Sequence, residues 1–250
     1  MGQHFLADPN IARKIAESLS GSQHYAYVLE VGPGTGMLSQ FLMGKPNHQW
    51  IGVELDSESV NFLTTKYPDY ASSVIEADFL HFDPEKILAD QHFALIGNFP
   101  YHISSQIIFK VLKHRQQIPE VVGMLQKEVA ERIAAKPGSK TYGILSVLSQ
   151  AFYHVKLLFT VPPHVFVPPP KVRSAVLRFE RKEDIVLDCD ETLFFKVVKT
   201  AFNQRRKTLR NSLKTMAVAW DMLPADLPQK RPEQLSVSDF VAITRNVGLK

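Results

Sequence analysis

The sequence predicts an α/β fold: a Rossmann-like, doubly wound sheet in residues 1–183, followed by a small all-helical domain in residues 184–250. Up to residue 135, apolar β-branched runs alternate with helical patterns every 20 to 30 residues, which is typical of a parallel sheet covered by helices. The first of these strands runs into the turn Gly32-Pro33-Gly34-Thr35-Gly36 and then a helical pattern, as the first unit of such sheets does. From residue 192 onward only helical patterns remain, so a second, helical domain is expected there.

Each element has its own signal along the chain. Residues 8–19 carry apolar side chains at helical spacing, with Asp8 as cap and Pro9 at the first helical position. Parallel strands are expected at Tyr25–Val31, Trp50–Leu55, Ser73–Ala77, Phe93–Gly97 and Val121–Gln126, and helices at Met37–Met43, Ser59–Lys66, Ser104–Leu112 and Lys127–Ala135. Strands at Val155–Val161 and Ala175–Phe179 flank the loop Pro162–Lys171, which indicates a hairpin rather than a crossover. Residues 192–246 are expected to be helical, with Pro224, Pro228 and Pro232 between segments.

Composition excludes several classes of protein. With 45% hydrophobic and 22% charged residues, the 250-residue chain is neither disordered nor fibrous. The lone Cys189 can form neither an internal disulfide nor a multi-thiolate metal site, which indicates a reducing compartment and argues against zinc. We expect no metal site. No uncharged apolar stretch reaches the roughly 18 residues of a membrane span, and the N-terminus lacks a signal-peptide pattern. We therefore expect a cytoplasmic protein that does not enter a membrane.

Segments that follow the predicted strands carry a candidate cofactor site, because the carboxyl ends of adjacent parallel strands form the ligand crevice of such a sheet. Gly32, Gly34 and Gly36 permit a tight turn and close ligand approach. Glu54, 22 residues beyond Gly32, is placed to accept hydrogen bonds from both hydroxyls of a ribose. These features alone fit NAD and S-adenosylmethionine equally, or a glycine turn with no ligand. The Gly-x-Gly-x-Gly spacing, and Asp78 after the third strand where it can bind an adenine edge, favour S-adenosylmethionine.

The tetrapeptide Asn98-Phe99-Pro100-Tyr101 follows the fourth strand, beside the predicted crevice. An adenine N6 amine is a poor nucleophile because its lone pair is delocalised into the ring, so it must be held with that lone pair aimed at an electrophile. The Asn98 amide oxygen and the Pro100 backbone carbonyl would both accept from N6, and Tyr101 offers a face on which a flipped base stacks. The alternative is an ordinary strand-to-helix turn, since Asn-x-Pro is common turn chemistry.

Six motifs, in order along the chain, resemble those of the ribosomal RNA adenine dimethyltransferases. They are Gln3-His4-Phe5-Leu6, Val28–Gly36, Val53–Asp56, Glu76–Asp78, Gly97–Tyr101 and Val165–Val172. The resemblance covers essentially the whole chain and is strongest to the bacterial branch that acts on small-subunit RNA. It implies a Rossmann-like, S-adenosylmethionine-dependent methyltransferase. It also implies a substrate, two adjacent adenosines in the 3′-terminal hairpin of small-subunit (16S) rRNA, dimethylated at N6 by a monomer acting on an assembling ribosomal subunit.

The same resemblance implies roles for individual residues. His4 and Leu6 border the cofactor, Gly32 and Gly34 lie under it, Glu54 binds its ribose, Asp78 binds its adenine, and Asn98 touches both cofactor and target. Phe99 is a departure, because the family usually has Leu in this tetrapeptide, and it bears on the wall of the pocket. Phe166, in the proline-stiffened loop, is expected to meet the second face of the flipped adenine opposite Tyr101; the alternative is a ring packed into the core.

The helical domain contains a basic stretch. Between Thr192 and Trp220 there are seven lysines and arginines and no acidic residue, which leaves the rest of the chain with a net charge of −3. A stripe of one sign suits a phosphate backbone, and helical spacing brings four of these side chains near one face. The candidate RNA-binding residues are Lys199, Arg205, Arg206, Lys207, Arg210 and Lys214, of which Lys199, Arg206, Arg210 and Lys214 share that face.

Three other functions compete with this interpretation. A large-subunit rRNA methyltransferase of the macrolide-resistance type shares the motifs but differs in its C-terminal domain. A ribosome-assembly factor with little or no catalysis is disfavoured by intact Gly32, Glu54, Asp78 and Asn98. A nicotinamide dehydrogenase is disfavoured because no Tyr-x-x-x-Lys or similar hydride-site pattern follows the sheet motifs.

Overall fold

The computed structural model describes residues 4–21, 25–183 and 186–248, and the chain divides into two compact units. The first unit comprises residues 1–130 and 155–181, and the second comprises residues 131–154 and 182–250. The segment 131–154 therefore groups with the C-terminal helices, whereas the sequence placed it in the sheet domain. The reason is local packing, since helix α6 (Ile144–Phe152) of this segment contacts α7 (Glu191–Asn203) and α9 (Val237–Arg245).

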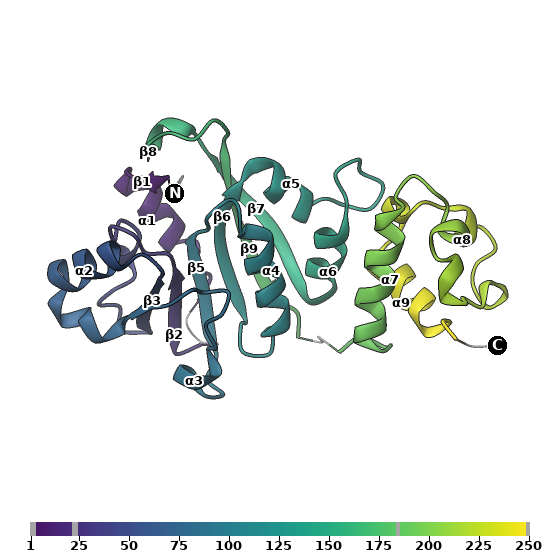
Figure 1. The fold of residues 1–250 in the computed structure, drawn as a ribbon, viewed down its shortest axis with the longest axis horizontal. Coiled ribbons are helices and arrows are strands. Elements are labelled where there is room, and N and C mark those ends of the chain that lie inside the picture. The colour runs from purple at the N-terminus through teal and green to yellow at the C-terminus, as the bar shows by residue number, and fades with distance from the viewer. Residues whose placement is uncertain (1–3, 22–24, 184–185, 249–250) are drawn as a thin grey trace. The chain divides into compact units, whose positions relative to one another are not determined.

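A seven-stranded sheet forms the centre of the first unit (Figure 1). In spatial order its strands are β4 (Val74–Glu76), β3 (Gln49–Glu54), β2 (Tyr27–Val31), β5 (Phe93–Asn98), β6 (Glu120–Gln126), β9 (Ser174–Arg181) and β7 (Tyr153–Val161). The pairs from β4 to β6 are parallel, and β9 is antiparallel to β6. Chain order reverses between β2 and β5, which is the position where an open sheet of this type binds ligands. The predicted strands and the hairpin of β7 and β9 are confirmed.

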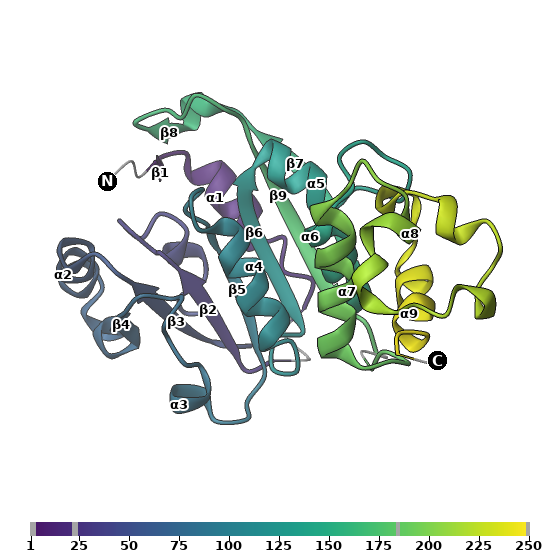
Figure 2. The same ribbon diagram turned by 45° about the vertical axis from the view of Figure 1, so that its right-hand side comes forward.

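Helices cover this sheet, and their ends follow local capping rules. Helix α1 (Pro9–Ala16) begins at the predicted cap, where the Asp8 carboxylate accepts from the backbone nitrogens of Asn10 and Ile11. Helix α4 (Ser104–Lys113) lies against β5 and β6 in both views (Figures 1 and 2). The remaining helices of the sheet region are α2 (Ser57–Lys66), α3 (Glu85–Leu88) and α5 (Lys127–Ile133). The helix expected at Met37–Met43 is instead a set of turns around a 3-10 helix at Ser39–Phe41.

A two-stranded antiparallel sheet ties the N-terminal segment to the proline-rich loop (Figure 1). Strand β1 (Phe5–Leu6) pairs with β8 (Phe166–Val167), so Leu6 lies opposite Phe166. The Ala7 backbone nitrogen donates to the Val165 carbonyl at 2.8 Å, and His4 Nδ1 lies 2.7 Å from the Pro168 carbonyl oxygen. Residues 4–7 are thereby fixed next to the carboxyl edge of the large sheet.

The second unit is helical, with α6, α7, α8 (Leu209–Ser212) and α9 (Figure 2). Its core includes Phe194, Val197, Val198 and Phe240, all fully buried. The prediction of helix throughout 192–246 is only partly correct, because α7 ends at Asn203 and short 3-10 turns occupy much of the rest. These turns are Lys214–Met216, Trp220–Met222, Leu227–Gln229 and Pro232–Gln234. Within the described residues, none of the helices has the length and apolarity needed to cross a membrane.

Candidate active site

Four predicted site residues lie at or just beyond the carboxyl ends of four neighbouring strands. Gly32 comes directly after β2, Glu54 ends β3, Asp78 lies two residues beyond β4, and Asn98 ends β5. Because these strands are adjacent in the order β4-β3-β2-β5, the four residues share one edge of the sheet, at its reversal of chain order. The structure therefore brings together the cofactor and reaction residues that the sequence predicted separately.

The glycine turn leaves its backbone accessible at one position. Gly32 has φ of +66°, and a Cβ built there would meet no atom within 4 Å. Gly34 has φ of +55°, and a Cβ there would lie 3.0 Å from the Phe5 ring. A ligand can thus approach the Gly32 backbone closely, while Gly34 provides room for the N-terminal segment.

Glu54 is a buried carboxylate that organises this turn. Its Oε2 accepts from the Gly34 nitrogen at 2.9 Å, and its Oε1 accepts from the nitrogens of Leu55 and Asp56 at 2.8 and 3.0 Å. A carboxylate offers about four acceptor sites, so roughly one remains. Binding both hydroxyls of a ribose, as predicted, would require one of these backbone donors to share its oxygen.

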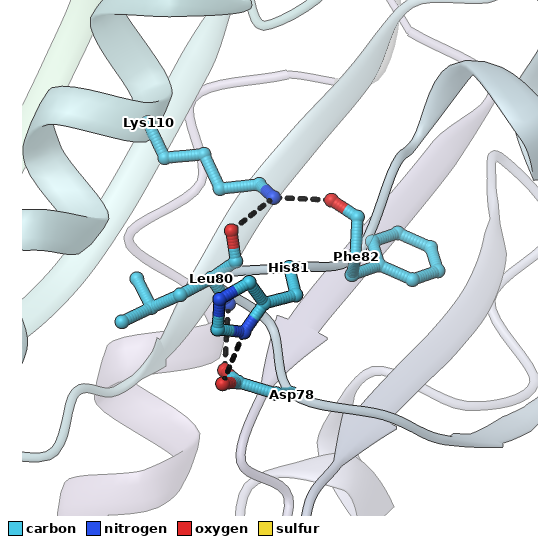
Figure 3. A network of polar contacts seen from close by, with 5 residues as sticks. All are labelled: Asp78, Leu80, His81, Phe82 and Lys110. Atoms are coloured by element: carbon cyan, nitrogen blue, oxygen red, sulfur yellow. Dashed lines mark hydrogen bonds and ion pairs between the residues drawn. The ribbon is translucent and has the colours of Figure 1, made fainter.

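Asp78 is held at both oxygens by its own loop (Figure 3). Oδ1 accepts from the Leu80 nitrogen at 2.8 Å, and Oδ2 lies 2.7 Å from His81 Nδ1. Partial burial raises the pKa of Asp78, but the hydrogen bonds from Leu80 and His81, together with the charges of His81 and Lys110, lower it below its ordinary value. Asp78 is therefore an anionic acceptor, partly exposed at the sheet edge, as an adenine-binding role requires.

The N-terminal segment contacts the reaction residues directly. Asn98 Nδ2 donates to the His4 carbonyl at 3.0 Å, and the rings of His4 and Tyr101 lie 5.8 Å apart at 36°. The Pro100 carbonyl, which was predicted to face a target amine, accepts from the Ile103 nitrogen at 3.1 Å and keeps its second lone pair. Gln3, which belongs to the same motif, lies outside the described residues.

Ser174 is a site residue that sequence reasoning missed. Its buried hydroxyl lies 2.6 Å from the Tyr101 hydroxyl, so it fixes the far end of the ring. A serine after a proline-rich loop carries no recognisable signal by itself. Only the register of β9 against β6, with Ser174 opposite Gln126, brings it to this edge.

Phe99 lies inside the sheet region. Its ring is fully buried, and a Cβ built at Gly123 of the neighbouring strand would lie 2.4 Å from it. The larger ring at this position is accommodated because β6 has no side chain at Gly123.

Phe166, predicted to stack on the target adenine, lies in the core in this structure. Its side chain is 1% exposed and belongs to the hydrophobic core cluster together with Leu6 and Val165. A ring packed in this way favours the alternative of a core residue, and a role in stacking on the adenine stays a prediction. The pairing of β1 with β8, across 160 residues of chain, turns this ring inward.

The six basic candidates lie in the second unit but not on one helix. Lys199 is on α7 and Arg210 on α8, while Arg205, Arg206 and Lys207 lie in the connection between these helices. The predicted single face is therefore wrong, because α7 ends before Arg206. Arg205 donates to the Lys140 carbonyl and lies 3.7 Å from Glu233, and Arg210 lies over the Trp220 ring. All of the candidates except Arg205 are exposed, namely Lys199, Arg206, Lys207, Arg210 and Lys214.

The sheet edge fits S-adenosylmethionine. It combines an open glycine backbone at Gly32, a buried carboxylate at Glu54 and an anionic acceptor at Asp78, which match a cationic adenosyl ligand. A separate cavity of about 380 Å³, lined in part by Arg13, Tyr25 and His48, lies at the amino ends of β2 and β3. That cavity is away from the sheet edge described above.

Comparison with known proteins assigns the chain to a family. Residues 1–227 match the family described as ribosomal RNA adenine dimethylase. The chain is 55% identical to ribosomal RNA small subunit methyltransferase A of Flavobacterium johnsoniae over 248 residues, 99% of this chain and 94% of that protein. It is 56% identical to the protein of the same name from Parabacteroides distasonis over 246 residues, 98% and 91% of the two chains.

Two solved structures share the fold. A dimethyladenosine transferase from Plasmodium falciparum superposes with a TM-score of 0.80 at 25% identity, covering 96% of both chains. The 23S rRNA methyltransferase ErmE superposes with a TM-score of 0.72 at 24% identity, covering 96% of this chain and 99% of the other. These findings confirm the Rossmann-like fold and the family that the six motifs predicted. The chain is thus a member of the ribosomal RNA adenine dimethylase family, an S-adenosylmethionine-dependent rRNA adenine dimethyltransferase.

Proposed function

We propose that this protein dimethylates N6 of two adjacent adenosines in the 3′-terminal hairpin of small-subunit rRNA, during assembly of the ribosomal subunit. Its relatives from F. johnsoniae and P. distasonis are named as small-subunit enzymes, which supports this RNA over a large-subunit one. The observation that carries the proposal is the position of Asn98, whose amide ends β5 beside the glycine turn of β2.

Asn98 acts as an oriented acceptor. Its Nδ2 is engaged by the His4 carbonyl at 3.0 Å, so the amide oxygen is the end left for an N6 amine. The target amine begins with two N–H bonds and finishes with none. A neutral amide suits this substrate because the amide itself need not gain or lose charge during the reaction. Holding the amine in one orientation is itself the main catalytic contribution, since correct positioning converts a bimolecular encounter into a local step.

Tyr101 supplies the surface for the target base. The hydrogen bond to Ser174 at 2.6 Å and the tilted contact with His4 restrict its ring. A base stacked on such a preset ring loses less entropy than one that must order a mobile side chain. With Phe166 in the core, Tyr101 is the aromatic residue to which we assign stacking.

The residues of the sheet edge then have distinct tasks. Gly32, Glu54 and Asp78 would hold S-adenosylmethionine, which supplies a methyl group on a sulfonium when bound. Asn98 and Tyr101 hold the amine in line with that methyl group. The amine becomes acidic as it is methylated, so its proton leaves to water, and no side-chain base is required.

We further propose that the exposed basic residues Lys199, Arg206, Lys207, Arg210 and Lys214 provide phosphate contacts, together with Arg205. Phosphate contacts hold and orient RNA without reading its sequence. Arg205 contributes least, because it already contacts the Lys140 carbonyl and Glu233 within its own unit.

A competition experiment tests the substrate. Small and large ribosomal subunits, both prepared without adenine methylation, are incubated together with methyl-labelled S-adenosylmethionine and the enzyme. We expect label only in the small-subunit RNA. Label in the large-subunit RNA would favour the macrolide-resistance type of activity, and no label in either would favour an assembly role without catalysis.

A further inference from the structure

Lys110 connects the helix that follows the reaction residues to the loop that carries Asp78. It lies in α4, which begins at Ser104, three residues after Tyr101. Its Nζ donates to the Leu80 carbonyl at 3.1 Å and also to the Phe82 carbonyl, and it lies 5.2 Å from the centre of the Phe79 ring. Figure 3 shows the extended lysine side chain reaching from the helix to these two oxygens.

The loop that Lys110 contacts is closed around Asp78. The backbone nitrogens of His81 and Phe82 donate to the Asp78 carbonyl at 3.0 and 2.8 Å. The Leu80 nitrogen donates to the Asp78 side chain, while the Leu80 carbonyl accepts from Lys110. One residue, Leu80, thus connects the lysine to the carboxylate, so the place of the Asp78 carboxylate depends on where Lys110 holds this loop.

The environment of Lys110 is that of a fixed structural cation. The side chain is partly buried, and burial, reinforced by nearby Lys113, lowers its pKa, whereas Asp83 and Asp78 act in the opposite direction. Its acceptors are two carbonyl oxygens of one loop, which require a donor with more than one N–H. A lysine meets that requirement, and an apolar side chain of similar length does not.

We propose that Lys110 is a positioning residue for the cofactor: it fixes the loop of residues 78–82 and thereby the affinity of Asp78 for the adenine of S-adenosylmethionine. The inference rests on the adenine-binding role proposed for Asp78. If Lys110 acts through that loop, its loss weakens cofactor binding, whereas turnover at saturating cofactor changes far less.

Calorimetric binding of S-adenosylhomocysteine to the full chain tests this proposal. Lys110→Met keeps the length of the side chain but removes the charge and the donors, and we expect about a tenfold weaker Kd. Lys110→Arg keeps both and should restore affinity to within about twofold of the wild type. Lys113→Met, one turn further along the same helix and exposed, is the matched control and should bind as the wild type does.

A double-mutant cycle with Asp78→Asn separates a positioning role from general destabilisation. If Lys110 acts through Asp78, the double variant binds no more weakly than the weaker single variant. Amide exchange in the cofactor-free protein gives a second readout: Lys110→Met should speed exchange at Leu80, His81 and Phe82, while the core of β5 stays protected. Should Lys110→Met misfold, Lys110→Gln provides the same comparison with one donor group retained.

Three results would overturn the inference. The first is wild-type affinity for S-adenosylhomocysteine in Lys110→Met. The second is a double variant whose loss of binding free energy equals the sum of the two single losses. The third is wild-type affinity in Asp78→Asn, which would show that Asp78 does not bind the cofactor. Failure of the proposed function looks different, because cofactor binding and its dependence on Lys110 would persist while small-subunit RNA stayed unmethylated.

Discussion

Tyr101 is held at its hydroxyl by Ser174, and we propose that its ring stacks on the target base. Replacing Tyr101 with Ala removes the ring, and we expect turnover on RNA to fall by about a hundredfold, the upper end of what one base–aromatic stack contributes. Replacing it with Phe keeps the ring and loses only the hydrogen bond, so activity should fall far less. Initial rates at saturating cofactor measure both.

Binding of S-adenosylhomocysteine is the control for this pair. The affinity should be unchanged in both variants, because Tyr101 is assigned to the target and not to the cofactor. An equal loss of cofactor affinity in Tyr101→Ala would contradict the stacking assignment.

Glu30, in the strand that leads into the glycine turn, is a buried acid whose titration makes the stability of the protein depend on pH. It is 1% exposed and accepts a hydrogen bond from Trp50 Nε1 at 2.9 Å. Burial raises its pKa from 4.5 to about 7, and the bond from Trp50 opposes this only in part. The folded state therefore binds this proton more tightly than the unfolded state, so the stabilisation is complete below pH 4.5 and is lost as pH rises through 7.

Glu30→Gln makes this dependence measurable, because the amide keeps an acceptor for Trp50 and does not titrate. Relative to that variant, the wild type should lose about 3 kcal/mol in free energy of unfolding between pH 4.5 and 7. Urea unfolding of both proteins across this range provides the measurement. Parallel pH profiles would show that Glu30 does not titrate in the folded protein.

The location of a single site residue could be predicted from the sequence where the end of a strand alone determines it. Glu54, Asp78 and Asn98 lie where strand ends and chain spacing place them. Phe166 and Ser174 were not, because their surroundings come from segments far away in the chain, Leu6 for the first and Tyr101 for the second.

At the scale of elements, two glycines of the turn between β2 and the following 3-10 helix differ in their surroundings. Substitution of one adds backbone strain alone, whereas substitution of the other also adds a steric clash. Gly32 and Gly36 both have positive φ, but only a Cβ at Gly36 would clash, 2.9 Å from the side chains of Leu63 and Tyr67. Gly32→Ala should destabilise the cofactor-free protein by about 1 kcal/mol from strain alone. Gly36→Ala should add about 1 to 3 kcal/mol of overpacking.

Cofactor binding should reverse this order. Gly32→Ala fills the open space beside the backbone and should weaken S-adenosylhomocysteine binding more than Gly36→Ala does. Thermal unfolding measures the loss of stability in each variant, and calorimetry measures the loss of cofactor affinity. If the same variant were the more damaged in both experiments, the roles assigned to Gly32 and Gly36 would be contradicted.

Phe99, directly after β5, packs against Gly123 of β6, where a Cβ would lie 2.4 Å from its ring. Gly123→Ala should destabilise the protein by about 1 to 3 kcal/mol, because its Cβ would overlap the ring. Phe99→Leu, which restores the residue more usual in the family, should recover much of that loss in the double variant. Denaturant unfolding of the wild type, the two single variants and the double variant gives the coupling energy between the two residues. Changes in free energy of unfolding that simply add would show that the two side chains do not interact.

The sequence predicted the parallel strands well because their buried runs are long and bounded by turn residues. It predicted helices less well where short-range signals are weak. Helix α6 was missed because nine mostly apolar residues behind a Gly and Pro loop show little polar contrast. The helix expected at Met37–Met43 is reduced to turns, and α7 ends at Asn203. Apolar spacing alone does not set the length of a helix, because most helical stability in proteins comes from tertiary packing.

At the scale of the whole molecule, charge is divided unevenly along the chain. The stretch between Thr192 and Trp220 carries seven basic residues, and the rest of the chain is net negative. RNA affinity should therefore fall steeply as salt rises, and Arg206→Gln with Lys207→Gln should reduce the slope of log K against log salt by about 2. Lys86→Gln with Lys113→Gln, an equal charge change on exposed residues of the sheet unit, should leave that slope near the wild-type value.

The central claim is that Asn98 orients an adenosine N6 for methyl transfer on small-subunit RNA. The direct test is nucleotide mapping of undermethylated small subunits after incubation with S-adenosylmethionine and either wild type or Asn98→Ala, each at saturating cofactor. We predict dimethyladenosine at two adjacent positions of the 3′-terminal hairpin with the wild type, and neither position modified with the variant. Modification elsewhere by the wild type, or an unchanged pattern with Asn98→Ala, would contradict the account.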